Sequence, residues 1–514
     1  MFDLLSHGLP LFLTFESLLL TALGIVGGLV IGVLPGLGPL MGIVLLLPFA
    51  FHLPPIPAMG MLIAIYIGGS AGGSISAILL RIPGTPLAAA TLFDGFPMAQ
   101  KGRAQEAVGL AMSASAVGGL VGGLVLVFLS PVLAKFALRF APPEYFALAV
   151  LGVLTIALVS EGSALKGLLA GGLGLFLSMI GTDEFTNAER FTFDNFKLAS
   201  GPHLVAVVVG LFALSEIFRQ VEAGGYLEQP RVQRLRVSFA ALGLLVRHKI
   251  NLLRSSLIGT FFGALPGAGG DVSAFISYAT AKKLARPGER YGEGAEGGVV
   301  AAEAANNACC GGALIPTLSL GIPGDASTAV LMGALILLGF FPGPDLFRDH
   351  PEVAGGIFVA YLMGNVMLLT LGVMLAPVFG SVLKVPKAWL LPAILLLSVL
   401  GTYSLQSSTF DLWVMFAFGA VGYVMRRAGY PLAPIIIGMI LGSVMESNLR
   451  RSLLLSEDGL TIFLERPIAA TILAVDAVLL LSIVYSTLKA SRKTKPRKDG
   501  SVSRGQSLVS TDSI

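Results

Sequence analysis

Residues 32–39 of this chain read GVLPGLGP, a glycine- and proline-rich break inside a long apolar segment. Residues 263–270 read GALPGAGG and break a second apolar segment in the same way. A further pair follows in the same order, since residues 80–86 read LRIPGTP and residues 320–326 read LGIPGDA. The two pairs are separated by 231 and 240 residues. Two ordered matches at nearly equal separations predict an internal repeat.

The composition is that of a membrane protein. Of the 514 residues, 55% are hydrophobic and 12% are charged, whereas about 25% are charged in an ordinary soluble domain. These values exclude a soluble globular enzyme and a disordered chain. The thinly spread basic residues exclude a nucleic-acid-binding protein, which needs them clustered on one face. Because each span needs about 20 apolar residues, we predict an all-α polytopic integral membrane protein with about 11–15 apolar helical segments.

The charges of the loops suggest that the two copies of the repeat are inverted. The basic loop at Lys101 corresponds to the mainly acidic residues 345–352, and the acidic loop 182–201 corresponds to the basic pair Arg426 and Arg427. The sign of the charge is swapped at both places, as expected if the copies enter the membrane from opposite sides. We therefore predict two inverted-topology repeats with broken or re-entrant helices, an arrangement typical of secondary transporters.

This interpretation divides the chain into five parts, and basic residues set its orientation. The parts are an N-terminal transmembrane repeat (10–218), a basic cytoplasmic linker (219–249), a C-terminal transmembrane repeat (250–446), an extra C-terminal span (447–488) and a disordered basic tail (489–514). The linker and the tail are expected in the cytoplasm, and the acidic loop 182–201 outside. Lys135 and Arg139 then fall on the outer side, against the rule.

The breaks also mark the candidate binding site. Proline removes a helix donor and glycine frees the backbone, and irregular backbone at membrane depth persists only where it is buried in protein or lines a cavity. Corresponding breaks in two halves point to a substrate site, although each could be a kink that holds no ligand. The adjacent amides of Asn306 and Asn307 favour a site further, because buried amides are costly unless they are satisfied. The substrate-binding candidates are Pro35, Gly36, Gly38, Ser70, Gly72, Gly73, Ser74, Pro83, Gly84, Thr85, Pro266, Gly267, Gly269, Asn306, Asn307, Pro323 and Gly324.

Carboxylates inside apolar segments are functional candidates because a charge is costly there. Asp271, Asp325 and Glu303 are the candidates for binding a coupling ion. A carboxylate beside a Pro-Gly break can bind a cation or cap a half-helix, and both roles remain open. The two cysteines are adjacent, at Cys309 and Cys310, and no metal-ligand spacing occurs. No metal site and no cofactor are therefore expected.

The motifs together resemble the large membrane subunit of the tripartite tricarboxylate transporters. In the first half the resemblance is carried by LPGLGP at 34–39, YIGGSAGGS at 66–74, IPGTP at 82–86 and DGFP at 94–97. In the second half it is carried by LPGAG at 265–269, EAANN at 303–307 and LGIPGD at 320–325.

The resemblance implies a function and partners. Such a subunit works in the bacterial inner membrane with a small membrane subunit and a periplasmic substrate-binding protein that captures carboxylates. It implies a permease for tricarboxylates or related carboxylates, coupled to a Na⁺ or H⁺ gradient. The alternative is a permease subunit driven by a separate ATPase, since the chain has no nucleotide-binding P-loop of its own. A membrane-embedded enzyme would need a convergent catalytic set, and none is found in the sequence.

Overall fold

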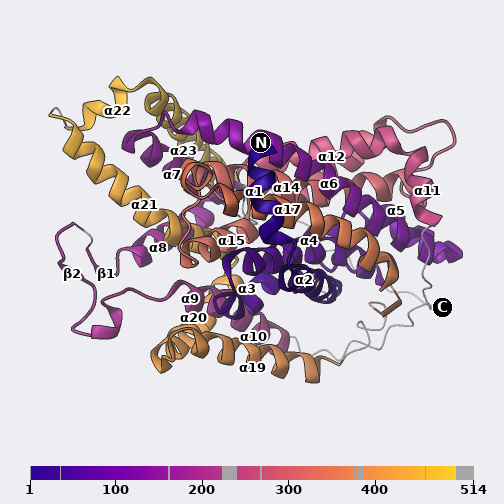
Figure 1. Cartoon of the computed structure of the whole chain (residues 1–514), viewed down its shortest axis with the longest axis horizontal. Coiled ribbons are helices and arrows are strands. Elements are labelled where there is room, and N and C mark those ends of the chain that lie inside the picture. The colour runs from indigo at the N-terminus through magenta and orange to yellow at the C-terminus, as the bar shows by residue number, and fades with distance from the viewer. Residues whose placement is uncertain are drawn as a thin grey trace, which may run out of the picture.

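The protein is almost entirely helical, as predicted. The computed structural model describes residues 2–34, 36–159, 163–183, 185–222, 240–266, 269–375, 377–378, 386–457 and 459–493. Figure 1 shows helices packed side by side throughout, with one short hairpin at the edge in which β1 (Gly181–Thr182) pairs antiparallel with β2 (Glu189–Arg190).

The helices of the first 222 residues run in the following order. They are α1 (Phe2–Phe12), α2 (Phe15–Val33), α3 (Gly38–Ala50), α4 (Pro55–Leu80), η1 (Pro86–Ala88), α5 (Leu92–Met98), η2 (Ala99–Arg103), α6 (Ala104–Ala137), α7 (Pro142–Val159), α8 (Ala164–Ser178), η3 (Phe196–Leu198), α9 (Leu204–Val209), η4 (Gly210–Leu214) and α10 (Ser215–Glu222).

The helices of the remaining chain follow. They are α11 (Ala240–Arg247), α12 (Lys249–Ala264), α13 (Gly269–Lys283), α14 (Glu296–Leu320), α15 (Ala326–Leu337), α16 (Pro344–Asp349), α17 (Pro351–Met367), η5 (Leu368–Gly372), α19 (Lys387–Gln406), α20 (Thr409–Arg427), α21 (Ala433–Leu455), η6 (Gly459–Thr461), α22 (Ile462–Glu465) and α23 (Pro467–Lys493).

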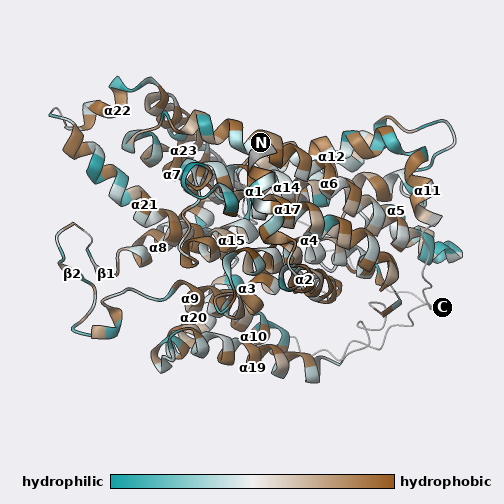
Figure 2. Cartoon of the chain, in the orientation of Figure 1, coloured by the Kyte–Doolittle hydropathy of each residue, from teal (hydrophilic) through white to brown (hydrophobic). Residues whose placement is uncertain are grey.

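Seven helical stretches of the described chain are long and apolar enough to cross a membrane. They are Phe15–Val33, Pro55–Leu80, Leu92–Ala137, Leu204–Glu222, Pro351–Gly372, Ala388–Gln406 and Pro467–Tyr485. Shorter apolar helices lie between them. Figure 2 shows hydrophobic residues along most helices and hydrophilic residues mainly at helix ends and in the connecting loops. The result is a multi-pass membrane protein in which several short helices complete the bundle.

Glycine allows the central helices to approach closely. A Cβ atom added at Gly24 or Gly28 of α2 would lie 2.5 or 2.6 Å from a backbone oxygen of α4, closer than any real contact of that kind. In the same way Gly122 of α6 faces Ala308 of α14, and Gly263 of α12 faces Cys309 on another side of α14. These glycines pack helices together, as small residues do in membrane proteins. The close approach of α6 and α12 leaves α14 buried from Gly297 to Ser319.

The two halves follow one order of elements around their breaks. In the first half α2 is followed by the break, by the short α3 and by the long α4; in the second half α12, α13 and α14 follow the same order. Both long helices end on a residue in the left-handed conformation, Arg81 (φ 59°) after α4 and Gly321 (φ 69°) after α14. A left-handed residue ends a helix because its backbone turns away from the helix axis.

The predicted linker and the predicted tail lie partly outside the described residues. The basic linker is helical at its edges, where α10 ends at Glu222 and α11 begins at Ala240, and residues 223–239 lie outside the described residues. The last helix, α23, continues to Lys493, beyond the predicted boundary at residue 488. Most of the predicted basic tail, residues 494–514, lies outside the described residues.

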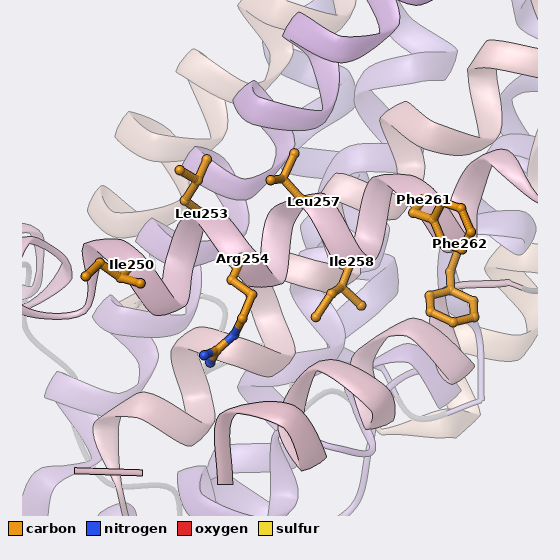
Figure 3. A pocket seen from close by; sticks show the side chains of 7 residues that line it. All are labelled: Ile250, Leu253, Arg254, Leu257, Ile258, Phe261 and Phe262. Atoms are coloured by element: carbon orange, nitrogen blue, oxygen red, sulfur yellow. The ribbon is translucent and has the colours of Figure 1, made fainter. Parts of the chain in front are cut away.

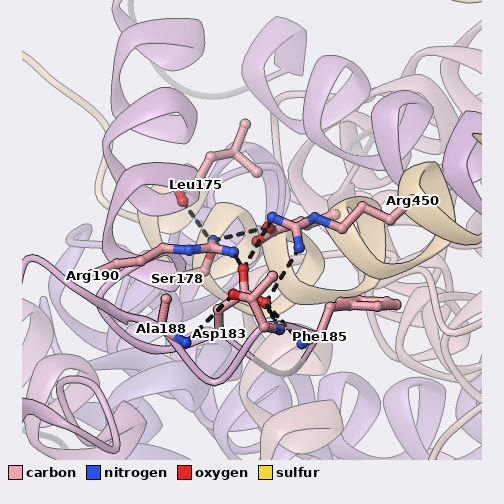
Figure 4. Close-up of polar contacts among 9 residues, drawn as sticks. Leu175, Ser178, Asp183, Phe185, Ala188, Arg190 and Arg450 are labelled. Atoms are coloured by element: carbon pink, nitrogen blue, oxygen red, sulfur yellow. Dashed lines mark hydrogen bonds and ion pairs between the residues drawn. The ribbon is translucent and has the colours of Figure 1, made fainter.

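The acidic loop 182–201 is held against the end of α21 by an ion-pair network around one buried carboxylate. Arg190 of the loop pairs with Asp183, and Arg450 of α21 lies 3.0 Å from the same carboxylate. Glu446 accepts from Arg190 at 2.9 Å and completes the network. Figure 4 shows both guanidinium groups directed at Asp183. The charge of the loop is thus partly neutralised within the protein.

Candidate functional site

The two breaks of the first half touch each other. The backbone N–H of Gly36, in the first break, donates to the carbonyl oxygen of Gly84, in the second, at 3.2 Å. The N–H of Gly84 in turn donates to the carbonyl of Gly73 in α4, also at 3.2 Å. Gly36 and Gly38 have φ values of +88° and +67°, which side chains rarely adopt. The first break therefore needs glycine for its conformation. Pro35, which precedes Gly36, lies outside the described residues.

Thr85 is buried directly beside this contact. A Cβ atom added at Gly84 would lie 2.6 Å from the Ser76 hydroxyl and 2.8 Å from the Cα of Gly73, so there is no room for a side chain there. The Thr85 hydroxyl oxygen is fully buried and has no hydrogen-bond partner among the described residues. An unsatisfied buried hydroxyl is costly, which makes Thr85 a candidate ligand-binding group.

The second half places Asp325 at the start of a helix. The Asp325 side chain accepts from the backbone N–H of Thr328 at 2.7 Å, and the Thr328 hydroxyl accepts from the backbone N–H of Asp325 at 2.9 Å. This is a capping box at the N-terminus of α15. Ahead of it, Gly324 packs against Ala313 of α14, where an added Cβ atom would lie 2.6 Å from a backbone carbon. Asp325 is therefore a helix cap in this structure.

The other predicted residues of the second half are placed less completely. Pro266 is half-buried and lies two residues after the end of α12. Gly269 is the first residue of α13. Gly267 and the side chain of Asp271 lie outside the described residues. The prediction that this break meets the others therefore stays a prediction. Gly72 and Ser74 lie within α4. Pro83 follows the C-terminal end of α4, and Pro323 follows the C-terminal end of α14.

Polar contacts join the two halves where α4 packs against α14. The Tyr66 hydroxyl of α4 donates to the Oδ2 atom of Asp325. Four residues further along α4, the carbonyl of Ser70 accepts from the Asn306 side chain at 3.1 Å, and its hydroxyl lies 3.3 Å from the Cys310 sulfur. Residues from both parts of the chain thus meet where α4 packs against α14.

Several amide atoms at this place have no partner. Asn306 and Asn307 are fully buried. Among the described residues, neither polar atom of the Asn307 side chain has a hydrogen-bond partner, and the Asn306 oxygen has none either. Each such atom costs about 1–3 kcal/mol when it is buried unpaired. A bound ligand, ion or water that supplied the missing partners would relieve that cost.

A third helix supports this amide pair. The Tyr361 hydroxyl of α17 donates to the backbone carbonyl of Asn307 at 3.0 Å, and the Asn365 side chain donates to the carbonyl of Tyr361 at 2.9 Å. The Asn365 side-chain oxygen is buried without a partner among the described residues. No sequence motif pointed to Tyr361 or Asn365. The Asn365 amide in an apolar segment is the same signal that singled out Asn306.

Glu303 is buried one turn away on α14 and bonded to hydroxyl groups. Its Oε1 atom accepts from the hydroxyl of Thr91, in the segment after the second break, and its Oε2 atom accepts from Ser115 of α6 at 2.7 Å. Within the described chain Glu303 forms no ion pair with a basic side chain. Thr91 and Ser115 were not predicted, because single hydroxyls in apolar segments carry no distinctive spacing.

Asp94, of the DGFP motif, has a structural role. Its Oδ1 atom accepts from the backbone N–H groups of Gly292, Gly294 and Ala295, each at 2.8 Å. Its Oδ2 atom accepts from the Tyr278 hydroxyl at 2.9 Å. The carboxylate thereby holds the turn before α14 in place. With its acceptors satisfied, Asp94 is bound within the protein and is not available to a ligand.

An open apolar groove of about 510 Å³ lies along α12, away from these contacts. It is lined by Ile250, Leu253, Arg254, Leu257, Ile258, Phe261 and Phe262. Figure 3 shows Leu253 and Leu257 directed to one side of α12 and Arg254 to the other. The groove contains none of the predicted binding residues, and its apolar lining suits lipid or another helix better than a hydrophilic substrate.

The family model described as the tripartite tricarboxylate transporter TctA family matches residues 18–437. An uncharacterised 52.8 kDa protein of the TAR-I ttuC′ 3′ region of Agrobacterium vitis is 37% identical over 497 residues, which are 96% of this chain and 98% of that protein. A second protein, of the TAR-II ttuC′ 3′ region of the same species, is 35% identical over 234 residues, 46% of this chain and 97% of its own length.

The fold defines the class, a multi-pass helical membrane protein with a buried polar centre. Within that class the chain belongs to the tripartite tricarboxylate transporter TctA family. This is a family of transporters and not of enzymes. The resemblance seen in the motifs is confirmed.

Proposed function

We propose that this chain is the membrane permease subunit of a binding-protein-dependent secondary transporter that imports tricarboxylates or related carboxylates. Its membership of the TctA family supports the transport role. The observation that carries the proposal is the buried centre where Tyr66 and Ser70 of one half meet Asp325 and Asn306 of the other. Secondary transporters bind their substrate between two parts of the molecule, so the contact between these two halves is a suitable place for the substrate site.

The substrate site in this proposal lies between the ends of α4 and α14. Thr85 and the amides of Asn306 and Asn307 present unpartnered polar atoms there. The amide nitrogen of Asn307 and the hydroxyl of Thr85 can donate to carboxylate oxygens without a fixed positive charge that would hold the substrate too tightly, whereas the amide nitrogen of Asn306 already donates to Ser70. The glycine-rich breaks add backbone N–H groups close by, although those of Gly36 and Gly84 are engaged in the observed state.

The proposed architecture is a pair of inverted repeats, 10–218 and 250–446, joined by the basic linker and followed by one further span. The matched order of α2–α3–α4 and α12–α13–α14 supports it. The left-handed ends of α4 and α14, at Arg81 and Gly321, support it as well, because they are 240 residues apart like the motifs that follow them. In this proposal the C-terminus lies in the cytoplasm of a bacterial inner membrane.

The proposed partners are a small membrane subunit and a periplasmic substrate-binding protein. A family of tripartite transporters implies three components, of which this chain is one. The binding protein would select the carboxylate, and this subunit would carry it across. A cation gradient, of Na⁺ or H⁺, would drive uptake, with Glu303, Asp325 or Asp271 as the group that binds the ion.

The test is uptake into liposomes that contain this subunit and both partners. Uptake of a radiolabelled carboxylate should follow an imposed ion gradient and should not require ATP. The alternative is tested in intact cells, where a separate ATPase would be present. If uptake there survives collapse of all ion gradients by an ionophore and stops on depletion of ATP, the chain is instead a permease subunit driven by that ATPase.

Asn307→Ala tests the position of the site. One amide hydrogen bond contributes about 0.5–1.5 kcal/mol to the free energy of binding. Its loss should therefore lower the initial uptake rate roughly two- to tenfold. Asn448→Ala is the matched control, since the Asn448 side chain donates within its own helix at 2.7 Å. The rate is normalised to the protein present in the membrane. Equal rates for the two variants would place the site elsewhere.

A further inference from the structure

Glu303 has the surroundings of a group that binds and releases a proton. It is fully buried in α14, and its two oxygens accept from the hydroxyls of Thr91 and Ser115. An ionised carboxylate with only neutral donors and no cation is costly inside a protein, by several kcal/mol. The same carboxyl group loses that cost when it is protonated, because the neutral acid needs no counter-charge.

The other charged and titratable groups around α14 are engaged elsewhere. Asp94 is held by backbone N–H groups and Tyr278, and Asp325 caps α15 and binds Tyr66. Glu296, about two turns from Glu303, pairs with Arg103 and His248. Arg254 of α12 donates to Asn251 at 2.6 Å. In the described chain, none of these groups neutralises Glu303.

The geometry suits the binding and release of a proton. Here the Ser115 hydroxyl is in direct hydrogen-bond contact with Glu303 at 2.7 Å, and Thr91 contacts the other oxygen directly. Hydroxyl groups can also reverse, donating to a carboxylate and accepting from a carboxylic acid. The three side chains can therefore accommodate both protonation states without a large movement.

The contact also lies where it can influence the conformation. Thr91 belongs to the segment that follows the second break of the first half, whereas Glu303 belongs to α14 of the second half. Ionised, the carboxylate accepts from both hydroxyls; protonated, it must donate to one of them. Protonation therefore changes the hydrogen bonding between the two halves next to the side chains of Asn306 and Asn307.

We propose that Glu303 carries the coupling ion of this transporter and that the ion is a proton. The proposal rests on the proposed function as a secondary transporter and names its driving ion. Glu303 takes up one proton when its surroundings open to the outside and releases it when they open to the cytoplasm. The O–H bond is the only bond that forms and breaks in each cycle.

The experiment compares Glu303→Gln with the parental protein in liposomes that contain the whole transporter. Glutamine resembles the protonated acid and cannot release a proton. The parental protein should accumulate a labelled carboxylate under an inward H⁺ gradient alone and should move protons inward with it, measured with an entrapped pH dye. The variant should lose both the accumulation and the proton movement but keep exchange of labelled for unlabelled substrate.

Asp476→Asn is the matched control. Asp476 is also a buried carboxylate, with both oxygens unpartnered among the described residues, but it lies in α23, outside the two halves. This variant should accumulate substrate like the parental protein. Loss of driven accumulation in the Asp476 variant as well would show a general effect of buried carboxylates and would overturn the proposal.

The outcomes separate this inference from the proposed function. If a Na⁺ gradient alone drives uptake and no protons move, the chain is still a secondary transporter and the role of Glu303 is wrong. If Glu303→Gln inserts normally but loses exchange together with accumulation, Glu303 serves substrate binding and the inference is also wrong. If no gradient of either ion drives uptake by the parental protein, the proposed function itself fails.

Discussion

At the scale of single residues, neighbouring glycines in α2 have different roles. A Cβ atom at Gly28 would lie 2.6 Å from the carbonyl oxygen of Ile65 and 2.8 Å from the nitrogen of Gly69, both in α4. A Cβ atom at Gly27 would meet nothing within 4 Å. The first glycine is therefore required for the contact between the two helices, and the second is not.

Gly28→Ala should separate α2 from α4 and destabilise the protein by about 1–3 kcal/mol, the usual cost of forcing atoms into a packed interior. Gly27→Ala should leave stability unchanged or raise it by up to about 1 kcal/mol, because alanine favours a helix. The measurement is the melting temperature of each purified variant in detergent. Equal melting temperatures would mean that the helices are not in contact at this point.

The sequence could predict the residues of the centre only in part. Gly84 and Asp325 stand out because they lie in a motif that occurs twice, Ser70 because it lies in a glycine-rich stretch, and Asn306 because it belongs to a pair of adjacent amides. Tyr361 has no such signal, and its role depends on α17 packing beside α14, which no local spacing reveals. Side chains that are brought together by the fold are thus harder to predict than breaks that the backbone itself requires.

At the scale of elements, the hairpin of β1 and β2 depends on the carboxylate of Asp183. Asp183→Asn removes the charge that pairs with Arg190 and Arg450 but keeps an oxygen for the backbone N–H groups. Since hydrogen bonds to charged groups contribute about 1.5–3 kcal/mol each, the loop should loosen locally. Trypsin should then cut faster at Arg190 and Lys197.

Asp194→Asn is the control for this prediction. Asp194 lies in the same loop, is exposed, and has a φ value of 58°, which asparagine also tolerates. The same chemical change should there leave the rate of cleavage unaltered, as measured by gel analysis over time. If both variants are cut at the parental rate, the ion pairs do not hold the loop.

The positions of the elements are the part that the sequence predicts best. The apolar segments beginning near residues 56 and 105 correspond to α4 and α6, because hydrophobic length alone indicates a membrane helix. The short helices between them were less predictable, since helices of ten to seventeen residues are stable here only through their neighbours. The hairpin was not predicted either, because its two-residue strands carry no periodic pattern.

At the scale of the whole molecule, the contact between α4 and α14 can be tested by a disulfide. The Ser70 hydroxyl oxygen lies 3.3 Å from the Cys310 sulfur. In a Cys309→Ala background, Ser70→Cys should form a disulfide with Cys310 on mild oxidation. A protease site inserted between residues 223 and 239 makes this visible, because the two fragments should run together on a gel until they are reduced.

The same disulfide reports on function. If transport requires the halves to move at this contact, oxidation should abolish uptake and reduction should restore it. The background chain with Ser70 intact should form no link and transport equally under both conditions. Failure of the fragments to join under oxidation would contradict the placement of the two halves against each other.

The central helix has a consequence for how the protein is made. Although α14 is 25 residues long and buried from Gly297 to Ser319, it is not among the helices apolar enough to cross a membrane. Its glutamate and paired asparagines would be rejected by the insertion machinery if that machinery met this segment alone. During synthesis α14 must therefore enter the bilayer against partners already there, α4 and α6, which precede it in the chain. The segment that brings the halves together is thus the one whose own insertion depends on the first half having been built.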